Sequence, residues 1–158
     1  MKKLTHLDKA GRPRMVDVTG KPDTHRRAVA KGLVRMQPAT FSRLHDGRIA
    51  KGDVLTVAQL AGITAAKKTP DLIPLCHPIL IDGVGIEFNL DEENSTVEIT
   101  ATVESTGKTG VEMEAMTAAA VTALTIYDMC KAIDRGIRIE NIRLIKKSGG
   151  KSGDITLE

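Results

Sequence analysis

The strongest constraint on the fold is a hydrophobic period of two that recurs along the chain. Residues 25–36 place small and apolar side chains at alternate positions, and the pattern stops before Pro38. Residues 83–90 and 97–104 alternate in the same way on either side of the acidic segment 91–94. Alternation of this kind is typical of half-buried strands, and a short polar segment between two of them predicts a hairpin.

Two longer segments follow the helical period instead. Asp53, a favoured N-cap residue, precedes apolar side chains at helical spacing that continue to about Lys68 and stop before Pro70. A second segment, rich in alanine and methionine, runs from about residue 111 to residue 134. Gly136 follows it and is a typical helix stop. The sequence therefore predicts two long helices.

A last apolar segment, residues 137–145, predicts a further strand. The resulting order, β-α-β-β-α-β, is the ferredoxin-like arrangement of the α+β class, in which an antiparallel sheet carries two long helices on one face. We expect a flexible N-terminal arm over residues 1–25, a single ferredoxin-like domain over 26–148 and a basic, glycine-rich C-terminal tail over 149–158. The fold alone names no function.

The composition argues against a nucleic-acid partner. RNA-recognition domains share this order of elements, but they stack bases on exposed aromatic side chains of the sheet. This chain of 158 residues has no tryptophan, one tyrosine and two phenylalanines, and the inner strands offer only Phe88. The net charge of +3 is also small for a protein that binds a polyanion.

The sequence also bears on the compartment. It shows no signal peptide and no apolar run near 20 residues, and it contains only two cysteines. We therefore expect a cytoplasmic protein with reduced thiols and no membrane association.

The segment Pro74–Pro78 places a thiol and an imidazole between two prolines. Proline fixes φ and favours extended backbone before it, so Cys76 and His77 should lie on a stiff connector and point to opposite sides. A metal site is disfavoured, because the two residues are adjacent and no second pair has metal-ligand spacing. Two interpretations stay open: a rigid loop with a packed thiol and a hydrogen-bonded imidazole, or a thiol nucleophile.

The second predicted helix carries two pairs of charged residues. Asp128 and Lys131 are three residues apart and therefore share a face. They form either an exposed ion pair or, because their neighbours are apolar, a partly buried pair able to exchange protons near neutrality. Glu112 and Glu114 stand in the first turn, where the helix dipole favours carboxylates. They lie about 200° apart around the helix, so at most one should face any given pocket.

Several cations are candidates for binding phosphate. Lys51 stands at the start of the first predicted helix, where a positive charge opposes the dipole; a phosphate ligand or simple solvation would explain it. The segment Gly149–Ser152 is not a P-loop, because its spacing is wrong and no helix follows. Further cations occur in the arm, the first strand and the tail: Lys21, Arg26, Arg27, Lys146, Lys147 and Lys151.

Seven segments, spread over almost the whole chain, resemble one family. They coincide with its motifs in order, and no motif position departs from the pattern. The family is that of cyclic pyranopterin monophosphate synthase, the C protein of molybdenum cofactor biosynthesis. The segments are Asp17–Thr19, Arg26–Ala30, Lys51–Val54, Pro74–Pro78, Gly110–Ala115, Tyr127–Lys131 and Lys146–Ser152.

The resemblance implies a lyase that acts on 3′,8-cyclo-7,8-dihydroguanosine 5′-triphosphate, a compound derived from GTP. The products would be cyclic pyranopterin monophosphate and diphosphate. Proton transfers would dominate the rearrangement of the ring, and charge neutralisation would dominate the attack of a sugar hydroxyl on the α-phosphate. The alternative is a regulatory subunit that binds a nucleotide without turnover.

The resemblance also implies a role for each candidate residue. Asp128 and Lys131 would be the general acid–base pair, and Lys51 a third catalytic group or a ligand of the α-phosphate. His77 would hydrogen-bond the triphosphate or shuttle a proton. The other substrate-binding residues would be Leu75 and Cys76 on the connector, Glu112, Met113 and Glu114 around the base, and Asp17, Lys21, Arg26 and Lys147 around the phosphates.

Family members form hexamers built as trimers of dimers, and the resemblance implies the same assembly here, with sites at subunit boundaries. It implies no resident metal or cofactor; Mg²⁺ accompanying the triphosphate is the one ion that we consider.

Overall fold

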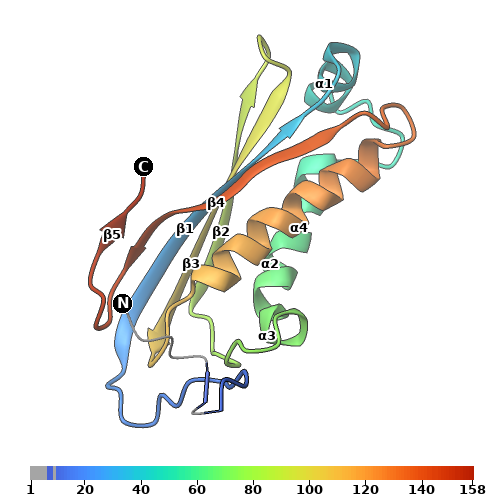
Figure 1. The fold of residues 1–158 in the computed structure, drawn as a ribbon. Coiled ribbons are helices and arrows are strands. Elements are labelled where there is room, and N and C mark those ends of the chain that lie inside the picture. Colours follow the sequence, from blue (N-terminus) through green and yellow to red (C-terminus); the bar gives the residue numbers. More distant parts are fainter. Residues whose placement is uncertain (1–6, 9) are drawn as a thin grey trace.

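The alternating segment that follows the arm forms the central strand of a five-stranded antiparallel sheet (Figure 1). This strand, β1 (Thr24–Arg35), pairs with β3 (Thr96–Gly107) on one side and with β4 (Arg138–Ser148) on the other. β2 (Gly83–Asp91) pairs with β3, and the short β5 (Ile155–Thr156) pairs with β4. The strand order is therefore β2-β3-β1-β4-β5.

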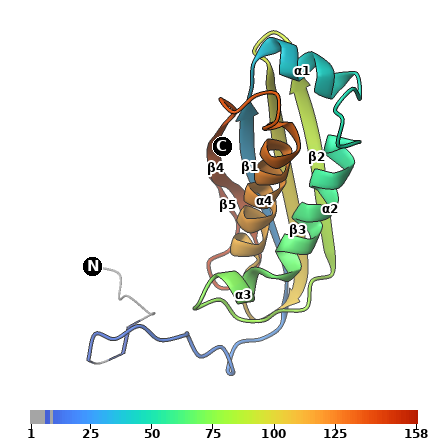
Figure 2. The same ribbon diagram turned by 90° about the vertical axis from the view of Figure 1, so that its right-hand side faces the viewer.

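Two long helices, α2 (Val54–Lys67) and α4 (Glu112–Cys130), lie side by side on one face of this sheet (Figure 2). They connect β1 to β2 and β3 to β4, so the predicted ferredoxin-like order and the single helical face are confirmed. The computed structural model describes residues 7–8 and 10–158; residues 1–6 and 9 of the predicted arm lie outside the described residues. Within the described chain, no helix combines the length and apolarity that a membrane crossing requires.

The core lies between the sheet and the two helices and is built from small aliphatic side chains. Alternate residues of β1 and β3 point toward the helices, and alanines of α4 pack against them. The opposite face of the sheet is charged, with Lys31 Nζ 2.8 Å from Glu98 Oε1. The completely buried core residues include Ala30, Val34, Val97, Ile99, Ala101, Val103, Ala115, Ala118, Ala119, Ala123 and Ile126.

The end of α4 differs from the prediction, because the helix stops at Cys130 and not near Asp134. The Asp134 carboxylate accepts hydrogen bonds from the backbone N–H of Gln37 and of Gly136, both at 2.9 Å. These bonds tie the chain to the end of β1 and turn it into β4. Tertiary contacts thus end the helix earlier than its apolar pattern indicates.

Three short elements were not predicted. Helices α1 (Pro38–His45) and α3 (Thr69–Leu72) each have a proline in their first turn. We interpreted these prolines as stops, but proline is equally suited to the first turn, where its missing N–H is not needed. The third element, β5, folds the glycine-rich tail back onto β4, and Arg143 Nη2 donates to Glu158 Oε2 at 2.7 Å.

Helices α2 and α4 are in close contact at Gly62. A methyl group on Gly62 would collide with the side-chain hydroxyl of Thr122 on α4. That hydroxyl is buried and has no hydrogen-bond partner within the described part of the chain. The close approach of the two helices therefore depends on the absence of a side chain at residue 62.

We expect Gly62→Ala to lower the free energy of unfolding by about 1–3 kcal/mol, because the added methyl overpacks the contact. Urea unfolding at fixed protein concentration measures this. Thr122→Ala should recover part of the loss in the double variant, because it removes the colliding hydroxyl. Equal stability of Gly62→Ala and the double variant would contradict a direct clash.

Candidate active site

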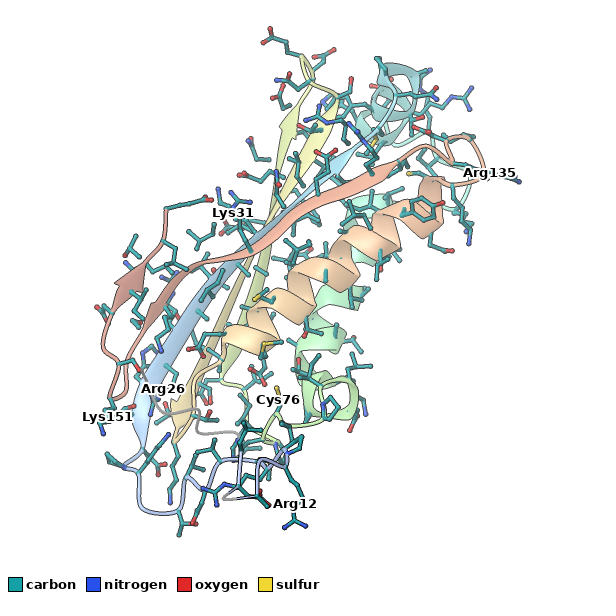
Figure 3. The ribbon with its side chains drawn as sticks, viewed as in Figure 1. Arg12, Arg26, Lys31, Cys76, Arg135 and Lys151 are labelled. Atoms are coloured by element: carbon teal, nitrogen blue, oxygen red, sulfur yellow. The ribbon has the colours of Figure 1, made fainter. Side chains whose placement is uncertain are left out.

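A cavity of about 350 Å³, here called the α4 pocket, lies where the arm, the Pro74–Pro78 connector and the first turn of α4 meet. Its volume falls within the range of small-molecule sites. In Figure 3 Cys76 marks this end of the molecule. The pocket is lined by Val16, Val18, Lys21, Leu75, Cys76, His77, Thr109, Gly110, Glu112, Met113 and Glu114.

The arm is held over the pocket by hydrogen bonds. His77 Nε2 lies 2.7 Å from the backbone oxygen of Val16, so this nitrogen carries a proton and donates it. Lys108 Nζ donates to the backbone oxygen of Thr19 at 2.8 Å. His77 therefore has a structural partner at Nε2, and Nδ1 is the ring nitrogen left for a ligand.

Cys76 and His77 both line the α4 pocket, and His77 also lines a neighbouring hollow beside Pro78. Burial, assisted by the charge of Glu114, raises the pKa of the Cys76 thiol. A raised pKa disfavours the thiolate, which is the reactive form of cysteine. The structure thus supports a packed thiol over a nucleophile.

Glu112 and Glu114 both line the α4 pocket, which differs from the expectation that at most one of them faces any given pocket. Glu112 is the first residue of α4, and its carboxylate folds back over Gly110, where a Cβ atom would collide with it. Lys147 Nζ on β4 donates to Glu112 Oε1 at 2.9 Å. The idealised angle of about 200° does not hold in this first turn, because the side chain of Glu112 bends toward Lys147.

Glu114 is 3% exposed. Burial raises the pKa of Glu114 to about 7, and the nearby charge of Glu112 acts in the same direction. The two carboxyl groups therefore share one pocket but stand in different surroundings.

A second hollow, here called the arm cavity, adjoins the α4 pocket and shares Lys21 with it. Arg26 on β1 is only 8% exposed, and its Nε donates to the backbone oxygen of Gly107 at 3.2 Å. Within residues 7–8 and 10–158, no carboxylate lies within ion-pair distance of Arg26, and a buried charge of this kind favours an anionic ligand. The cavity is lined by Gly20, Lys21, Pro22, Thr24, Arg26, Gly150 and Lys151.

The glycine-rich turn after β4 forms one wall of the arm cavity, and Figure 3 shows Arg26 and Lys151 at the same end of the sheet. Gly149 and Gly150 have φ of 90° and 73° and pack against His25 and Arg26. A Cβ atom on Gly150 would collide with the Arg26 guanidinium. The two glycines thus allow the turn to lie against the buried arginine.

The three residues predicted to be catalytic lie together at the other end of α4. Lys131 Nζ is 2.6 Å from Asp128 Oδ1, and Lys51 Nζ is 3.2 Å from Asp128 Oδ2 and 2.9 Å from the Asp128 backbone oxygen. We call this group the lysine–aspartate cluster. Asp53 accepts from the Thr56 N–H at 3.1 Å as the N-cap of α2, which places Lys51 beside the end of α4.

The lysine–aspartate cluster is exposed in this chain, with 45%, 57% and 50% of the side chains of Lys51, Asp128 and Lys131 accessible. Hydrogen bonds from Lys131 and then Lys51 lower the pKa of Asp128, and Asp128 raises the pKa of Lys131. Both shifts move the pKa values of these two groups further from neutral pH. The interpretation as a partly buried pair is therefore wrong for the single chain, which holds an exposed ion pair.

The α4 pocket and the cluster are far apart. Glu112 and Asp128 lie sixteen residues apart on α4, which corresponds to roughly 24 Å along the helix axis. In Figure 3, Cys76 lies at one end of this helix and Arg135 at the other. One chain thus brings most of the predicted substrate-binding residues together at one end of α4, but separates them from the predicted catalytic ones at the other.

Two of the predicted phosphate-binding residues have other partners in this structure. Asp17 is not among the pocket residues; its Oδ1 accepts from the Thr19 N–H at 2.9 Å, a bond that lowers the pKa of Asp17 and shapes the arm. Lys147 is paired with Glu112. Lys21 and Arg26 line the arm cavity.

Sequence reasoning missed some residues of these sites. Val16, Thr109 and Gly110 line the pocket, and Thr24 lines the arm cavity. The signal for Gly110 was its place just before the first turn of α4. For the others no local signal exists, because the arm meets them only in the folded chain. The described residues contain no group of three or more histidine, cysteine or acidic side chains placed to hold a metal ion.

Comparison with known proteins agrees with these motifs. The model of the MoaC family matches residues 15–150. A protein of Roseiflexus sp. (strain RS-1), named cyclic pyranopterin monophosphate synthase, is 63% identical over 154 residues, which cover 98% of each chain. Proteins with the same name from Heliobacterium modesticaldum and Thermoanaerobacter pseudethanolicus are 63% and 61% identical over 97% and 95% of this chain and 96% and 95% of their own. The chain is a member of the MoaC family.

Proposed function

We propose that this protein is a cyclic pyranopterin monophosphate synthase of molybdenum cofactor biosynthesis. It converts 3′,8-cyclo-7,8-dihydroguanosine 5′-triphosphate to cyclic pyranopterin monophosphate and diphosphate. The observation that carries the proposal is the identity of up to 63%, over nearly the whole chain, with proteins of that name. We assign the reaction to the lyases, because diphosphate leaves as a new ring closes and no water or second substrate is consumed.

The two adjoining cavities suit the two halves of this substrate. The α4 pocket offers carboxyl groups, which can accept hydrogen bonds from the N–H groups of a guanine-derived base. The arm cavity offers Lys21, the buried Arg26 and Lys151, whose charges match a triphosphate. Lys21 lines both cavities, so we place the base and the phosphates on either side of it, with His77 Nδ1 toward the phosphates.

We assign catalysis to the lysine–aspartate cluster of a neighbouring subunit. The cluster is roughly 24 Å from the pocket in its own chain, so a second chain must supply it. Docking against the pocket would also bury the cluster, and burial moves the pKa values of carboxyl and ammonium groups toward neutrality. We therefore propose sites at subunit boundaries, in a hexamer built as a trimer of dimers.

The roles of the groups follow from the reaction. Asp128 and Lys131 transfer protons while the purine-derived ring opens and recloses as a pyranopterin. A sugar hydroxyl then attacks the α-phosphorus; one P–O bond forms, the bond to the β-phosphate breaks, and diphosphate carries away the electron pair. Lys51, Lys21 and Arg26 neutralise the charge that develops on the phosphates.

The proposal also covers a metal ion that would accompany the substrate and the compartment of the enzyme. An Mg²⁺ ion carried in by the triphosphate would share the neutralisation of charge. We place the enzyme in the cytoplasm, where the nucleotide pool lies and where Cys76 and Cys130 stay reduced.

We expect Lys51→Ala, Asp128→Ala and Lys131→Ala each to lower diphosphate release from the cyclised substrate by at least about 10²-fold, the usual size of general acid–base effects. Circular dichroism and sizing should show an unchanged fold and assembly. Asp71→Ala is the matched control, because Asp71 forms an exposed i, i+3 pair with Lys68 and lines neither the α4 pocket nor the arm cavity. Near-normal turnover by Asp128→Ala would refute the assignment.

Mixing two inactive variants tests whether one site uses two chains. We expect His77→Ala and Lys131→Ala, co-expressed, to recover up to about a quarter of wild-type activity, since half of randomly paired dimers contain one intact site of two. Lys51→Ala with Lys131→Ala is the control, because both residues lie in the same cluster. Failure of the first pair to recover activity would show that each chain holds a whole site.

A further inference from the structure

The two carboxyl groups of the α4 pocket have different neighbours. Glu112 is paired with the Lys147 ammonium at 2.9 Å, which stabilises its charged form. Glu114 is 3% exposed, and no basic side chain of the described residues lies within ion-pair distance of it. Its own backbone N–H is the one hydrogen bond that favours its charged form. A charged carboxylate that is buried without a cationic partner has a high free-energy cost.

We propose that Glu114 keeps its proton up to about neutral pH and, as a carboxylic acid, donates a hydrogen bond to the substrate, while Glu112 beside it is the carboxylate that accepts. The pocket then presents one donor and one acceptor. This goes beyond the shared role of the three residues 112–114 around the base, because it gives the two glutamates opposite functions. The inference rests on the proposed function for the identity of the substrate, but not for the protonation state.

The charged and titratable groups around Glu114 come from every element that meets at the pocket. Glu112 on α4 repels a second negative charge, and Cys76 and His77 face the pocket from the connector. Lys21 faces it from the arm, and Lys147 on β4 is engaged by Glu112. The largest effect on Glu114 is burial, which raises its pKa to about 7.

A neighbouring subunit would change this balance in two ways. Its lysine–aspartate cluster carries two ammonium groups against one carboxylate and would favour a charged Glu114. Its surface would also exclude more water, which favours the uncharged form. We expect the second effect to prevail, because Asp128 already neutralises one of the two lysines, and the test uses the assembled protein.

A donor beside an acceptor selects a particular ligand edge. A guanine-type ring presents N–H groups next to a carbonyl oxygen, which pair with the Glu112 carboxylate and the Glu114 hydroxyl. An adenine-type ring lacks this carbonyl and cannot use the donor in the same way. The two glutamates together therefore select for guanine-derived bases, and the selection weakens when Glu114 loses its proton.

Binding of GTP, a stable probe with the same base edge, tests the donor role by calorimetry between about pH 6 and 8.5. Wild-type affinity should fall about tenfold per pH unit above 7 as Glu114 ionises. Glu114→Gln keeps an N–H donor at every pH, so it should lose this slope and bind GTP several-fold more tightly than wild type at pH 8.5. Glu114→Ala should bind weakly throughout, and ATP should show no slope that depends on Glu114.

The titration of Glu114 in the ligand-free assembled protein separates this inference from the proposed function. Carbon-13 NMR of labelled glutamate, with the Glu114 signal identified by its absence in Glu114→Gln, should show a midpoint near pH 7. A midpoint near pH 4.5, or GTP affinities of wild type and Glu114→Gln that fall in parallel, would overturn the proposal. If the protein releases no diphosphate or binds no GTP, the midpoint alone decides the protonation state.

Discussion

The packing of α4 against the sheet is the constraint on which the rest of the structure depends. Alanines at the buried positions of the helix let its backbone lie close to β1 and β3, and larger side chains would push it away. Because the helix is buried along its length, its two ends have fixed positions. One end carries the pocket carboxyl groups and the other carries Asp128, so this packing sets both the shape of the pocket and the distance to the cluster.

The electrostatics of the two ends differ for the same reason. The first turn of α4 lies beneath the arm and the connector, and Glu114 is removed from water there. In the last turn, Met129 and Cys130 are buried, but Asp128 and its lysines lie on the exposed side and form an ordinary exposed ion pair. A group suited to proton transfer needs an environment that brings its pKa toward neutrality. Among the described residues of a single chain, the first turn of α4 has this environment and the last turn does not.

Much of the fold was predictable from the sequence, because period-two and helical patterns report burial directly. The patterns gave the four long strands, both long helices and their order. The patterns failed where a few tertiary contacts determine the local structure. Asp134 ends α4 earlier than predicted, and Pro38, which we interpreted as a stop, begins a helix. The motifs predicted a set of candidate site residues, but they did not predict how these residues are arranged in space. Nothing local indicated that Glu112 would bend toward Lys147, or that Lys51 would lie beside Asp128.

The glycine turn against Arg26 has a consequence for biosynthesis of the chain. β1 is made early, but its partner β4 and the turn at Gly149 and Gly150 are made only after β2, β3 and α4. Until then, β1 is an unpaired edge of the growing sheet, and the arm cavity lacks one wall. The nascent chain therefore cannot hold a phosphate there, and binding becomes possible only after β4 has paired with β1 and the turn has packed against Arg26.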